Sequence, residues 1–330
     1  MSSVKPKISI CIPTYNQKPE YLRVCVQSAL KQSYDPIEVI VSENHSTNDA
    51  PAVLSEFKDP RLRVVKPPVH LSAVQNFAFC AAQSTGDYLN FLSSDDLLHP
   101  DFTYRMVEIL DAHPNLAFAH SAVARINEKG QIHGYERSIS PSFVRNGPQE
   151  LQRYVWGQRN VIIAALIRRS AYEVAGGWTD PDLVADWYLS LRLLTVGDVA
   201  YCSDVLAYYR DWLTPERRRR FLPWVRDMRL LYEKLESSEI VNLIDGGMDT
   251  LYKARRRHAV HMAAGLPISD LSPTELTQAI REIMLLNDSL AVRVRLRLVQ
   301  AGLGPLFLAR KRARWWIRQR IKSFLYPKGA

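Results

Sequence analysis

Two adjacent carboxylates stand at the end of a short apolar run in the first third of the chain. Asp95 and Asp96 come shortly after Tyr88–Leu92, in which only Asn90 is a strongly polar residue. Neighbouring carboxylates repel each other unless a cation relieves the repulsion. Mg²⁺ or Mn²⁺ would do this with hard oxygen ligands and would also bind the phosphates of a substrate. A second interpretation stays open, in which the pair is solvated and begins the helix that follows.

A third carboxylate stands at the start of a predicted helix in the middle of the chain. Leu189, Leu193 and Val196 recur at helical spacing after Asp186, which predicts a helix that begins near Asp186. The helix dipole favours a carboxylate at this end. By position alone, Asp186 could also be a simple helix N-cap, so its type and place do not establish a catalytic role.

The elements that must position these groups alternate between strands and helices. Short apolar runs predict strands, and apolar residues at helical spacing predict helices between them. The predicted strands are 8–12, 37–41, 62–65 and 88–92, and the predicted helices are 20–32, 50–57 and 72–83. This alternation predicts a largely parallel, doubly wound α/β sheet, in which ligands bind at the carboxyl ends of the strands. Polar residues follow three of these strands directly, at 14–16, 42–44 and 93–96.

The second part of the chain has a different pattern. After residue 212 we find helical periodicity and no strand-like run, with Ser272 and Glu275 spaced as a capping box. We therefore predict a first domain over residues 1–212 and a helical, basic C-terminal region over residues 213–330. No run of about 18 apolar residues occurs, so we expect no membrane-spanning helix and a cytoplasmic location.

Three motifs follow one another in the first third of the chain. They are I-S-I-C-I-P-T-Y-N at 8–16, E-V-I-V-S-E-N-H-S-T-N-D at 38–49, and G-D-Y-L-N-F-L-S-S-D-D-L-L-H-P-D at 86–101. Together, and in this order, they resemble the N-terminal half of the family-2 glycosyltransferases. The joint match covers roughly the first 105 residues, and its specificity comes from the three segments together. The resemblance implies a GT-A fold, which is Rossmann-like, and an enzyme that takes a sugar from a nucleotide-diphosphate sugar.

The resemblance also implies a role for several residues of the nucleotide-binding half. Pro13, Thr14 and Tyr15 match the loop that lines the base. Glu43 stands where these enzymes usually place an Asp that binds the base, and its side chain is one methylene longer. Asn76 matches an Asn of a helix that runs under the nucleotide, whereas the neighbouring Gln75 replaces a common Arg.

For the part of the site where the sugar is transferred, the resemblance implies residues that bind the metal, residues near the donor ribose, and a residue that accepts the proton. Asp95 corresponds to the principal ligand of Mn²⁺ or Mg²⁺, with Asp96 as a helper and Ser94 near the donor ribose. Ser93 occupies the first acidic position of the family's D-x-D region, so one carboxylate fewer is present. Asp186 corresponds to the second acid of a pair, which accepts the proton of the acceptor hydroxyl, and the first acid is Ala185 here.

The sequence can also be compared with the family on the acceptor side of the site and at the end of the first domain. The resemblance places Gly177, Trp178 and Trp187 on the acceptor side. Related enzymes often carry a His shortly after the Tyr-Arg that ends this domain, but Asp211 and Trp212 stand there. Arg210 itself has two open interpretations, one as a partner of the diphosphate and one as half of a structural salt bridge.

The charge of the chain is concentrated at its C-terminus. The net charge is +9, yet residues 289–330 contain eleven basic residues and no acidic one. On a helical projection, residues 306–325 combine basic residues with an apolar face that includes Trp and Phe, as in helices that lie on anionic membranes. The alternative is a helix packed on the first domain with its charges in solvent. Nucleic acid also attracts such a segment, but no groove-reading motif accompanies it, so we expect no nucleic-acid partner.

These observations predict an inverting, metal-dependent glycosyltransferase. We expect a nucleotide-sugar donor, UDP-linked since UDP is the commonest nucleotide in the family, and a glycan or polyprenyl-linked glycan acceptor in cell-surface polysaccharide synthesis. The expected location is peripheral, on the cytoplasmic face of the inner membrane. The alternative prediction is a catalytically inactive nucleotide-sugar-binding protein, which the changes at Ser93, Gln75 and Asp211 favour.

Overall fold

The computed structural model describes residues 5–136, 141–211 and 220–303. By its internal contacts the chain divides into two compact units, Met1–Trp212 and Leu213–Ala330. Among the described residues, no helix is long and apolar enough to cross a membrane. The segment predicted as an amphipathic basic helix, residues 306–325, lies outside the described residues.

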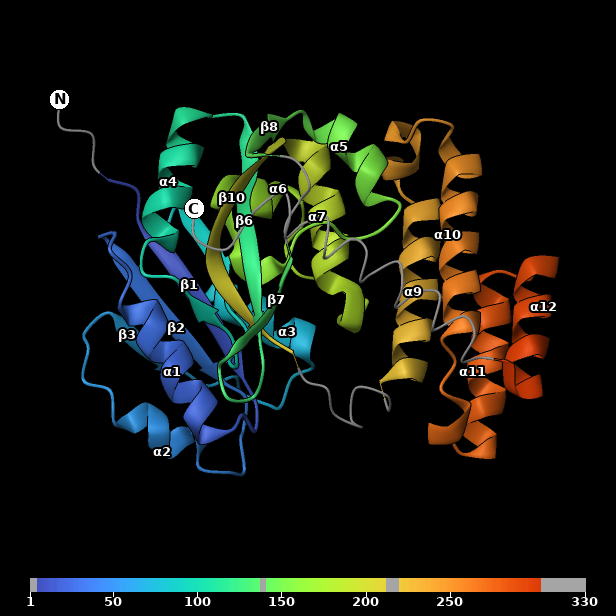
Figure 1. Cartoon of the computed structure of the whole chain (residues 1–330). Coiled ribbons are helices and arrows are strands. Elements are labelled where there is room, and N and C mark those ends of the chain that lie inside the picture. Colours follow the sequence, from blue (N-terminus) through green and yellow to red (C-terminus); the bar gives the residue numbers. More distant parts are fainter. Residues whose placement is uncertain (1–4, 137–140, 212–219, 304–330) are drawn as a thin grey trace. The chain divides into compact units, whose positions relative to one another are not determined.

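The first unit is an α/β structure built on one mixed sheet (Figure 1). The described strands are β1 (Ile8–Thr14), β2 (Ile37–Glu43), β3 (Leu62–Val65), β4 (Tyr88–Phe91), β5 (Leu97–Leu98), β6 (Leu116–Ile126), β7 (Ile132–Glu136), β8 (Phe143–Arg145), β9 (Ala165–Arg168) and β10 (Asp198–Arg210). Their order across the sheet is β3-β2-β1-β4-β9-β6-β10-β5, with β7 beside β6 and β8 beside β10.

The helices of this unit connect and cover the strands. They are α1 (Pro19–Leu30), α2 (Ala50–Ser55), α3 (Ala73–Ala82), α4 (Phe102–Ala112), α5 (Gly147–Tyr154), α6 (Arg169–Val174) and α7 (Ala185–Val196). The strand order reverses at β1, since β2 and β3 lie on one side of it and β4 on the other. Such a reversal point is where an open α/β sheet binds its ligand.

The sequence pattern predicts these first elements closely, with α3 as an example. Ser72 is the expected N-cap, and its side chain accepts from the backbone N–H of Gln75 while the Gln75 side chain accepts from the Ser72 N–H. The strands β1 to β3 are fully parallel to their neighbours, as predicted.

The expectation of a largely parallel sheet is met only in part. Strand β9 runs antiparallel to both of its neighbours, β4 and β6. Strands β5, β7 and β8 also pair antiparallel. These antiparallel strands all follow β4, beyond the last of the strands predicted from apolar runs.

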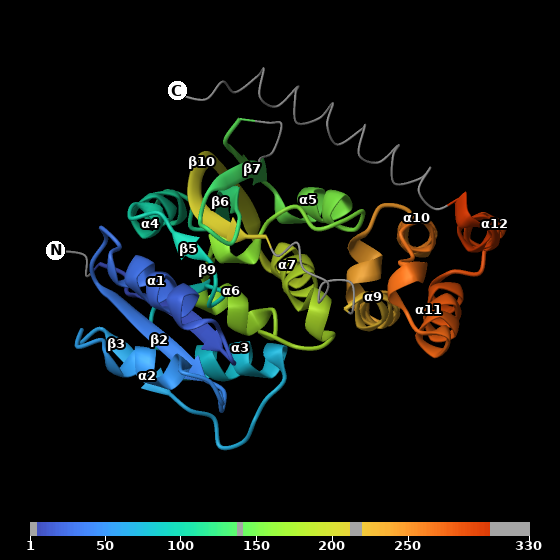
Figure 2. The same ribbon diagram turned by 60° about the horizontal axis from the view of Figure 1, so that its bottom comes forward.

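The described part of the second unit is helical. Its α-helices are α9 (Phe221–Glu236), α10 (Gly247–Ala264), α11 (Pro273–Leu286) and α12 (Leu290–Leu298). They run alongside one another, seen from the side in Figure 1 and along their axes in Figure 2. The capping box expected from Ser272 and Glu275 starts α11.

Candidate active site

The predicted site residues of β1, β2 and β4 emerge at one edge of the sheet. Thr14, the last residue of β1, is the register partner of Glu43, the last residue of β2. On the other side of β1, Cys11 is opposite Phe91 at the end of β4. Since these three strands are parallel, the residues that follow them lie next to one another, as the sequence pattern indicated.

The part of this edge predicted to bind the nucleotide base holds a buried carboxylate beside an unsatisfied hydroxyl. Glu43 is buried, its Oε1 accepts from the Ser46 N–H at 2.6 Å, and its Oε2 lies 3.7 Å from Nζ of Lys66. The Thr14 hydroxyl is buried and has no hydrogen-bond partner. A buried polar group without a partner is costly in the free protein, so a ligand that bonds this hydroxyl would remove the cost.

An aromatic pair lies next to this position. Tyr15, half exposed, directly follows the buried Pro13 and Thr14, and its ring centroid is 4.5 Å from that of His70. Nδ1 of His70 lies 3.1 Å from the carbonyl oxygen of Asn44, which follows β2. The segment before α3 therefore returns to the edge where β1 and β2 end.

Asn76 is buried and bonds to protein groups instead of facing open space. Its Oδ1 accepts from the Ser42 hydroxyl at 2.5 Å, and its Nδ2 donates to the Ser42 carbonyl at 3.4 Å. In this structure the amide fixes α3 against the end of β2. Its predicted contact with the donor stays a prediction.

The acidic pair is held by the last residue of β10. The backbone N–H of Arg210 donates to Oδ1 of Asp96 at 2.6 Å, and Nε of Arg210 donates to the carbonyl of Asp95 at 2.9 Å. Asp96 is almost fully buried, whereas Asp95 is partly exposed. Ser94, also buried, accepts from Nε2 of Gln17 at 3.2 Å. The turn after β4 is thus fixed from two sides.

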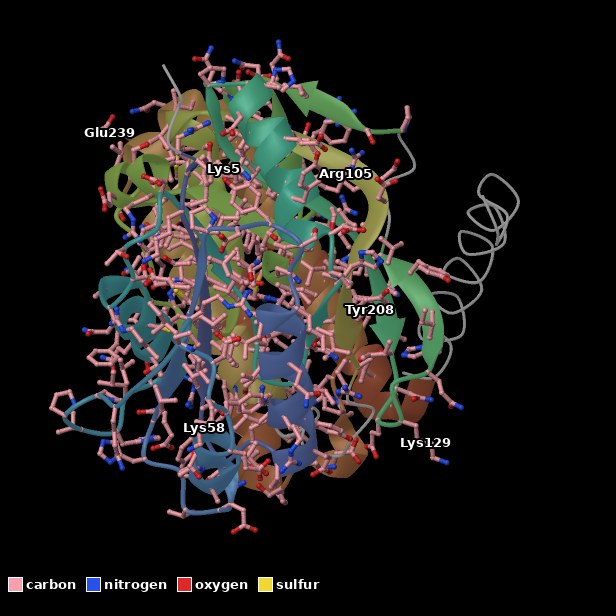
Figure 3. All side chains as sticks on the ribbon, turned by 90° about the vertical axis from the view of Figure 1, so that its left-hand side faces the viewer. Lys5, Lys58, Arg105, Lys129, Tyr208 and Glu239 are labelled. Atoms are coloured by element: carbon pink, nitrogen blue, oxygen red, sulfur yellow. The ribbon has the colours of Figure 1, made fainter. Side chains whose placement is uncertain are left out.

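The contacts of Arg210 within the protein go to main-chain oxygens and to an aromatic ring, and its predicted contact with the diphosphate stays a prediction. The guanidinium is buried, lies 4.1 Å from the ring centroid of Tyr21, and donates through Nη1 to the carbonyls of Asn127 and Glu128. The turn that contains Asn127 and Glu128 joins β6 to β7, and Lys129 lies at its tip (Figure 3). Arg210 therefore bonds main-chain oxygens and couples this turn to the acidic pair.

The acidic pair fits a divalent cation whose other ligands come from the substrate. Oδ2 of Asp96 is buried without a hydrogen-bond partner. Burial, followed by the negative charge of Asp95, raises the pKa of Asp96 well above its ordinary value. Within the described residues, no group of three or more His, Cys, Asp or Glu residues could hold a metal ion. Mg²⁺ commonly takes one or two carboxylates and completes its shell with phosphate oxygens and water.

Asp186 lies at the start of α7 with both carboxylate oxygens bonded. Oδ1 accepts from the Trp187 N–H at 2.8 Å, and Oδ2 accepts from Nε2 of Gln158 at 2.6 Å. Burial raises the pKa of Asp186, while these donors act in the opposite direction. Each carboxylate oxygen can accept a second hydrogen bond, so Asp186 retains the capacity to accept a proton from a substrate.

Strand register brings the segment before β9, which follows Gln158 in the chain, to the edge where β4 ends. Because β9 is antiparallel to β4, its first residue, Ala165, lies near the carboxyl end of β4. Asn90 of β4 donates to the carbonyls of Ile163 and Ala165 at 2.8 and 2.9 Å. The segment that leads into β9 therefore starts beyond the end of β4, on the side of the acidic pair.

A second connection joins the segment before α7 to the nucleotide side. Oδ1 of Asp182 accepts from the backbone N–H of Val74 at 2.6 Å and from the Ser72 hydroxyl at 3.4 Å. Asp182 thus adds a carboxylate to the N-terminus of α3, where the helix dipole favours a negative charge. The segment that leads into α7 and Asp186 is therefore bonded directly to the helix that packs behind Glu43.

The residues predicted for the acceptor side are embedded in the protein. Trp178 is buried and stacks on Phe77 of α3 at 4.6 Å, and its indole N–H has no partner. Trp187 is buried and donates from Nε1 to the Tyr154 carbonyl at 2.8 Å. Gly177 has a φ of +59°, and a Cβ there would lie 2.9 Å from the Tyr172 ring. An acceptor contact from these residues stays a prediction.

Several residues at this edge were not recognised in the sequence. Gln158, Asp182, Lys66 and His70 contact predicted site residues or the helix beside them from distant parts of the chain. They carry no local motif, because their contacts depend on the three-dimensional pairing of segments. A pattern within one segment gives no signal for such partners.

Comparison with protein families gives a match over much of the first unit. Residues 9–175, about half of the chain, match the model of glycosyl transferase family 2. A protein of Mycobacterium tuberculosis, uncharacterised protein MT1568, is 27% identical over 231 residues, covering 66% of this chain and 72% of that protein. Hyaluronan synthase of Pasteurella multocida is 31% identical over 130 residues, covering 38% of this chain and 13% of that protein.

Other relatives are much longer than the shared region. The chain spans 14% of the length of protein y4gI of Sinorhizobium fredii and 32% of protein CgeD of Bacillus subtilis. Among solved structures, S. aureus TarS 1–349 in complex with UDP-GlcNAc has a TM-score of 0.59 at 14% identity, covering 90% of this chain and 92% of that chain. A Pyrobaculum calidifontis mannosyltransferase in complex with GDP-Man and Mn²⁺ has a TM-score of 0.56 at 14% identity, covering 99% of this chain and 89% of that chain. These structural matches show the shared fold.

Proposed function

Because the chain belongs to glycosyl transferase family 2, we propose that it transfers a sugar from a nucleotide-diphosphate sugar to a hydroxyl group with inversion at the anomeric carbon. The observation that carries this proposal is that Glu43 and Asp95–Asp96 follow the carboxyl ends of β2 and β4 at one edge of the sheet, while Asp182, four residues before Asp186, bonds the start of α3. Glu43, the acidic pair and Asp186 then correspond to a nucleotide contact, a cation site and a proton acceptor.

The reaction needs one proton acceptor and one leaving group. Asp186 takes the proton from the acceptor hydroxyl as its oxygen bonds to the anomeric carbon, and the bond from that carbon to the donor phosphate breaks. The bonding electron pair leaves with the nucleoside diphosphate. A single displacement without a covalent enzyme intermediate inverts the anomeric configuration. The raised pKa of Asp186 makes this carboxylate a stronger base than an ordinary aspartate.

Mg²⁺ or Mn²⁺ would be held by Asp95 and Asp96 and would supply positive charge beside the departing diphosphate. Arg210 holds the Asp96 carboxylate through its backbone N–H and the Asp95 main chain through its guanidinium. On the nucleotide side, Glu43 would accept from an N–H of the base, with Thr14 and Tyr15 beside it. Asn76 would support this side of the site through Ser42, and Ser94, next to the acidic pair, would contact the ribose.

We take a UDP-sugar as the donor and a hydroxyl of a glycan or polyprenyl-linked glycan as the acceptor, in the synthesis of cell-surface polysaccharide. The UDP-GlcNAc complex of S. aureus TarS, which shares this fold, supports a UDP-linked donor. The basic, aromatic segment 306–325 supports a peripheral position on the cytoplasmic face of the inner membrane, where lipid-linked acceptors are found.

Donor consumption tests this function against a protein that only binds nucleotide sugars. The purified chain is incubated with a panel of UDP-, dTDP-, GDP- and CMP-linked sugars, with Mn²⁺ and then with a chelator, and free nucleotide is measured. We expect slow release of nucleoside diphosphate from one donor, dependent on the cation, because water replaces the acceptor. Tight donor binding with no release, even when glycan acceptors are added, would instead support the non-catalytic alternative.

A further inference from the structure

The outward side of α12 combines exposed apolar and basic side chains on one stripe of the helix, which we call the α12 stripe. Leu290, Arg293, Val294 and Arg297 follow the spacing i, i+3, i+4 and i+7, so they lie on one side of the helix. Leu290 is 77% exposed and Val294 is 45% exposed, and both arginines are exposed. The opposite side of α12 is buried through Val292 and Leu296.

The stripe belongs to a helix that is anchored in its own unit. Helix α12 packs against α10 and α11, and it is the outermost of the labelled helices in the second unit (Figure 1). Arg293 forms an ion pair with Asp288, which precedes the helix, at 2.5 Å. The stripe is therefore a fixed surface of a folded unit, and its two apolar residues are held in water in the described structure.

The charge around the stripe indicates what can cover it. Residues 304–330, which follow the described part of the chain, contain eight basic residues and no acidic one. That segment would bring positive charge onto Arg293 and Arg297, and so would the same stripe of a second copy. An anionic surface attracts both arginines without this repulsion, and its phosphates would compete with Asp288 for Arg293.

The apolar residues of the stripe favour a lipid bilayer over nucleic acid as the anionic partner. Single-stranded nucleic acid is bound by stacking of bases on aromatic side chains, and the stripe contains none. Insertion of Leu and Val side chains at the boundary between lipid headgroups and acyl chains lowers the free energy of the system, while arginine guanidinium groups remain at the level of the lipid phosphates. Basic residues next to such a surface are attracted by its negative potential.

We propose that the α12 stripe is a docking surface for a bilayer rich in anionic phospholipid. This extends the membrane contact proposed for residues 306–325, on which it partly rests, by adding a folded surface in which Leu290 and Val294 insert and Arg293 and Arg297 contact phosphates. The second unit then takes part in orienting the protein on the bilayer.

The test measures binding of the full chain to vesicles in the absence of any sugar donor, so it is independent of glycosyl transfer. Vesicles of equal parts phosphatidylglycerol and phosphatidylcholine are compared with pure phosphatidylcholine by co-sedimentation. The variants are Leu290→Asp with Val294→Asp, and separately Arg293→Gln with Arg297→Gln. Val174→Asp is the matched control, because Val174 is 74% exposed on α6 of the first unit.

We expect the wild type to bind the anionic vesicles and not the neutral ones. The Leu290/Val294 variant should bind anionic vesicles about ten-fold more weakly than the wild type. At low salt, the affinity of the Arg293/Arg297 variant for these vesicles should fall by a similar factor. The control should bind as the wild type does, and residual binding by both stripe variants would come from the unaltered residues 306–325. Thermal melting confirms that each variant is folded.

Wild-type affinity in both stripe variants would overturn the proposal and leave residues 306–325 as the membrane contact. A change of oligomeric state in the Leu290/Val294 variant, without a change in vesicle binding, would overturn it in favour of a second copy of the chain. Absence of wild-type binding to anionic vesicles would overturn it as well.

Discussion

The backbone N–H of Arg210 donates to Oδ1 of Asp96 at 2.6 Å, so the end of β10 fixes the carboxylate that follows β4 across 114 residues of sequence. This bond leaves Oδ2 of Asp96 as the oxygen without a partner, in a buried position. The same residue uses its side chain to bond the Asp95 carbonyl and the β6–β7 turn. One buried arginine therefore fixes the Asp96 carboxylate through its backbone N–H and the Asp95 main chain through its guanidinium.

Removing this side chain should destabilise the first unit. We expect Arg210→Ala to lower the free energy of unfolding by about 2–4 kcal/mol, because three carbonyl oxygens lose a charged donor. Urea unfolding followed by tryptophan fluorescence measures the change. The control is Arg105→Ala, since Arg105 is exposed on α4 (Figure 3) with surface ion pairs to Glu108 and Asp204 and should change stability by less than about 1 kcal/mol. Equal effects of the two substitutions would contradict this role of Arg210.

Replacing the proposed proton acceptor should affect turnover and spare donor binding. We expect Asp186→Asn to lower kcat by about 10²–10⁴-fold, the usual contribution of a positioned base. The Kd for the nucleoside diphosphate should remain nearly unchanged, because asparagine keeps the size of the side chain and the proposed nucleotide contacts come from the Glu43 side. Asp101→Asn, at an exposed position before α4, is the matched control for both measurements. A variant that retains wild-type kcat would exclude Asp186 as the base.

The pH profile should report the environment of Asp186. The base acts only when deprotonated, so kcat should fall as the pH falls through its pKa. Because burial raises that pKa, the acidic limb should lie above the pKa of an ordinary aspartate. Gln158 donates to the ionised carboxylate, so Gln158→Leu should raise the pKa further and move the limb to higher pH. Gln149→Leu, at an exposed position on α5, should leave the limb in place, and an unmoved limb in the Gln158 variant would count against the assignment.

The contact between Asp182 and α3 should contribute to the stability of the first unit. Asp182→Ala removes the acceptor for the Val74 N–H, and the loss of such a helix cap costs about 1 kcal/mol. For a unit of this size we expect Tm to fall by roughly 2–4 °C. Asp182→Asn retains an oxygen acceptor, so its Tm should fall by less than that of the alanine variant. Identical melting of the alanine variant and the wild type would show that this bond does not stabilise the fold.

The first four strands could be predicted from the sequence because each is a short apolar run, and three of them are followed directly by polar residues. The same pattern located Thr14, Glu43 and Asp95–Asp96 at one edge, since parallel strands bring their carboxyl ends together. The antiparallel strand β9 could not be predicted, because strand direction depends on pairing with β4 and β6. Asp182 and Gln158 were missed for a related reason, since their hydrogen bonds join segments that are 108 and 28 residues apart.

The family resemblance and the structure contribute different parts of the site. The motifs indicated which residue types stand at the ends of the strands, and the family match confirms the glycosyltransferase class. Arg210 shows what the motif could not provide. The structure gives it the carbonyls of Asp95, Asn127 and Glu128, and contacts with main-chain oxygens leave no signal in the sequence.

The central claim, a cation-dependent nucleotide-sugar site at the end of β4, is tested most directly by thermal stability. The chain and its Asp95→Ala variant are titrated with UDP, dTDP, GDP and CMP, each with and without Mn²⁺. A ligand that binds only the folded state raises stability by RT ln(1 + [L]/Kd), about 2.7 kcal/mol at a hundred times Kd. We expect UDP to raise Tm only in the presence of Mn²⁺, and Asp95→Ala to abolish that increase while retaining the Tm of the free protein. If no nucleotide changes Tm under any of these conditions, the assignment of this edge as the donor site is wrong.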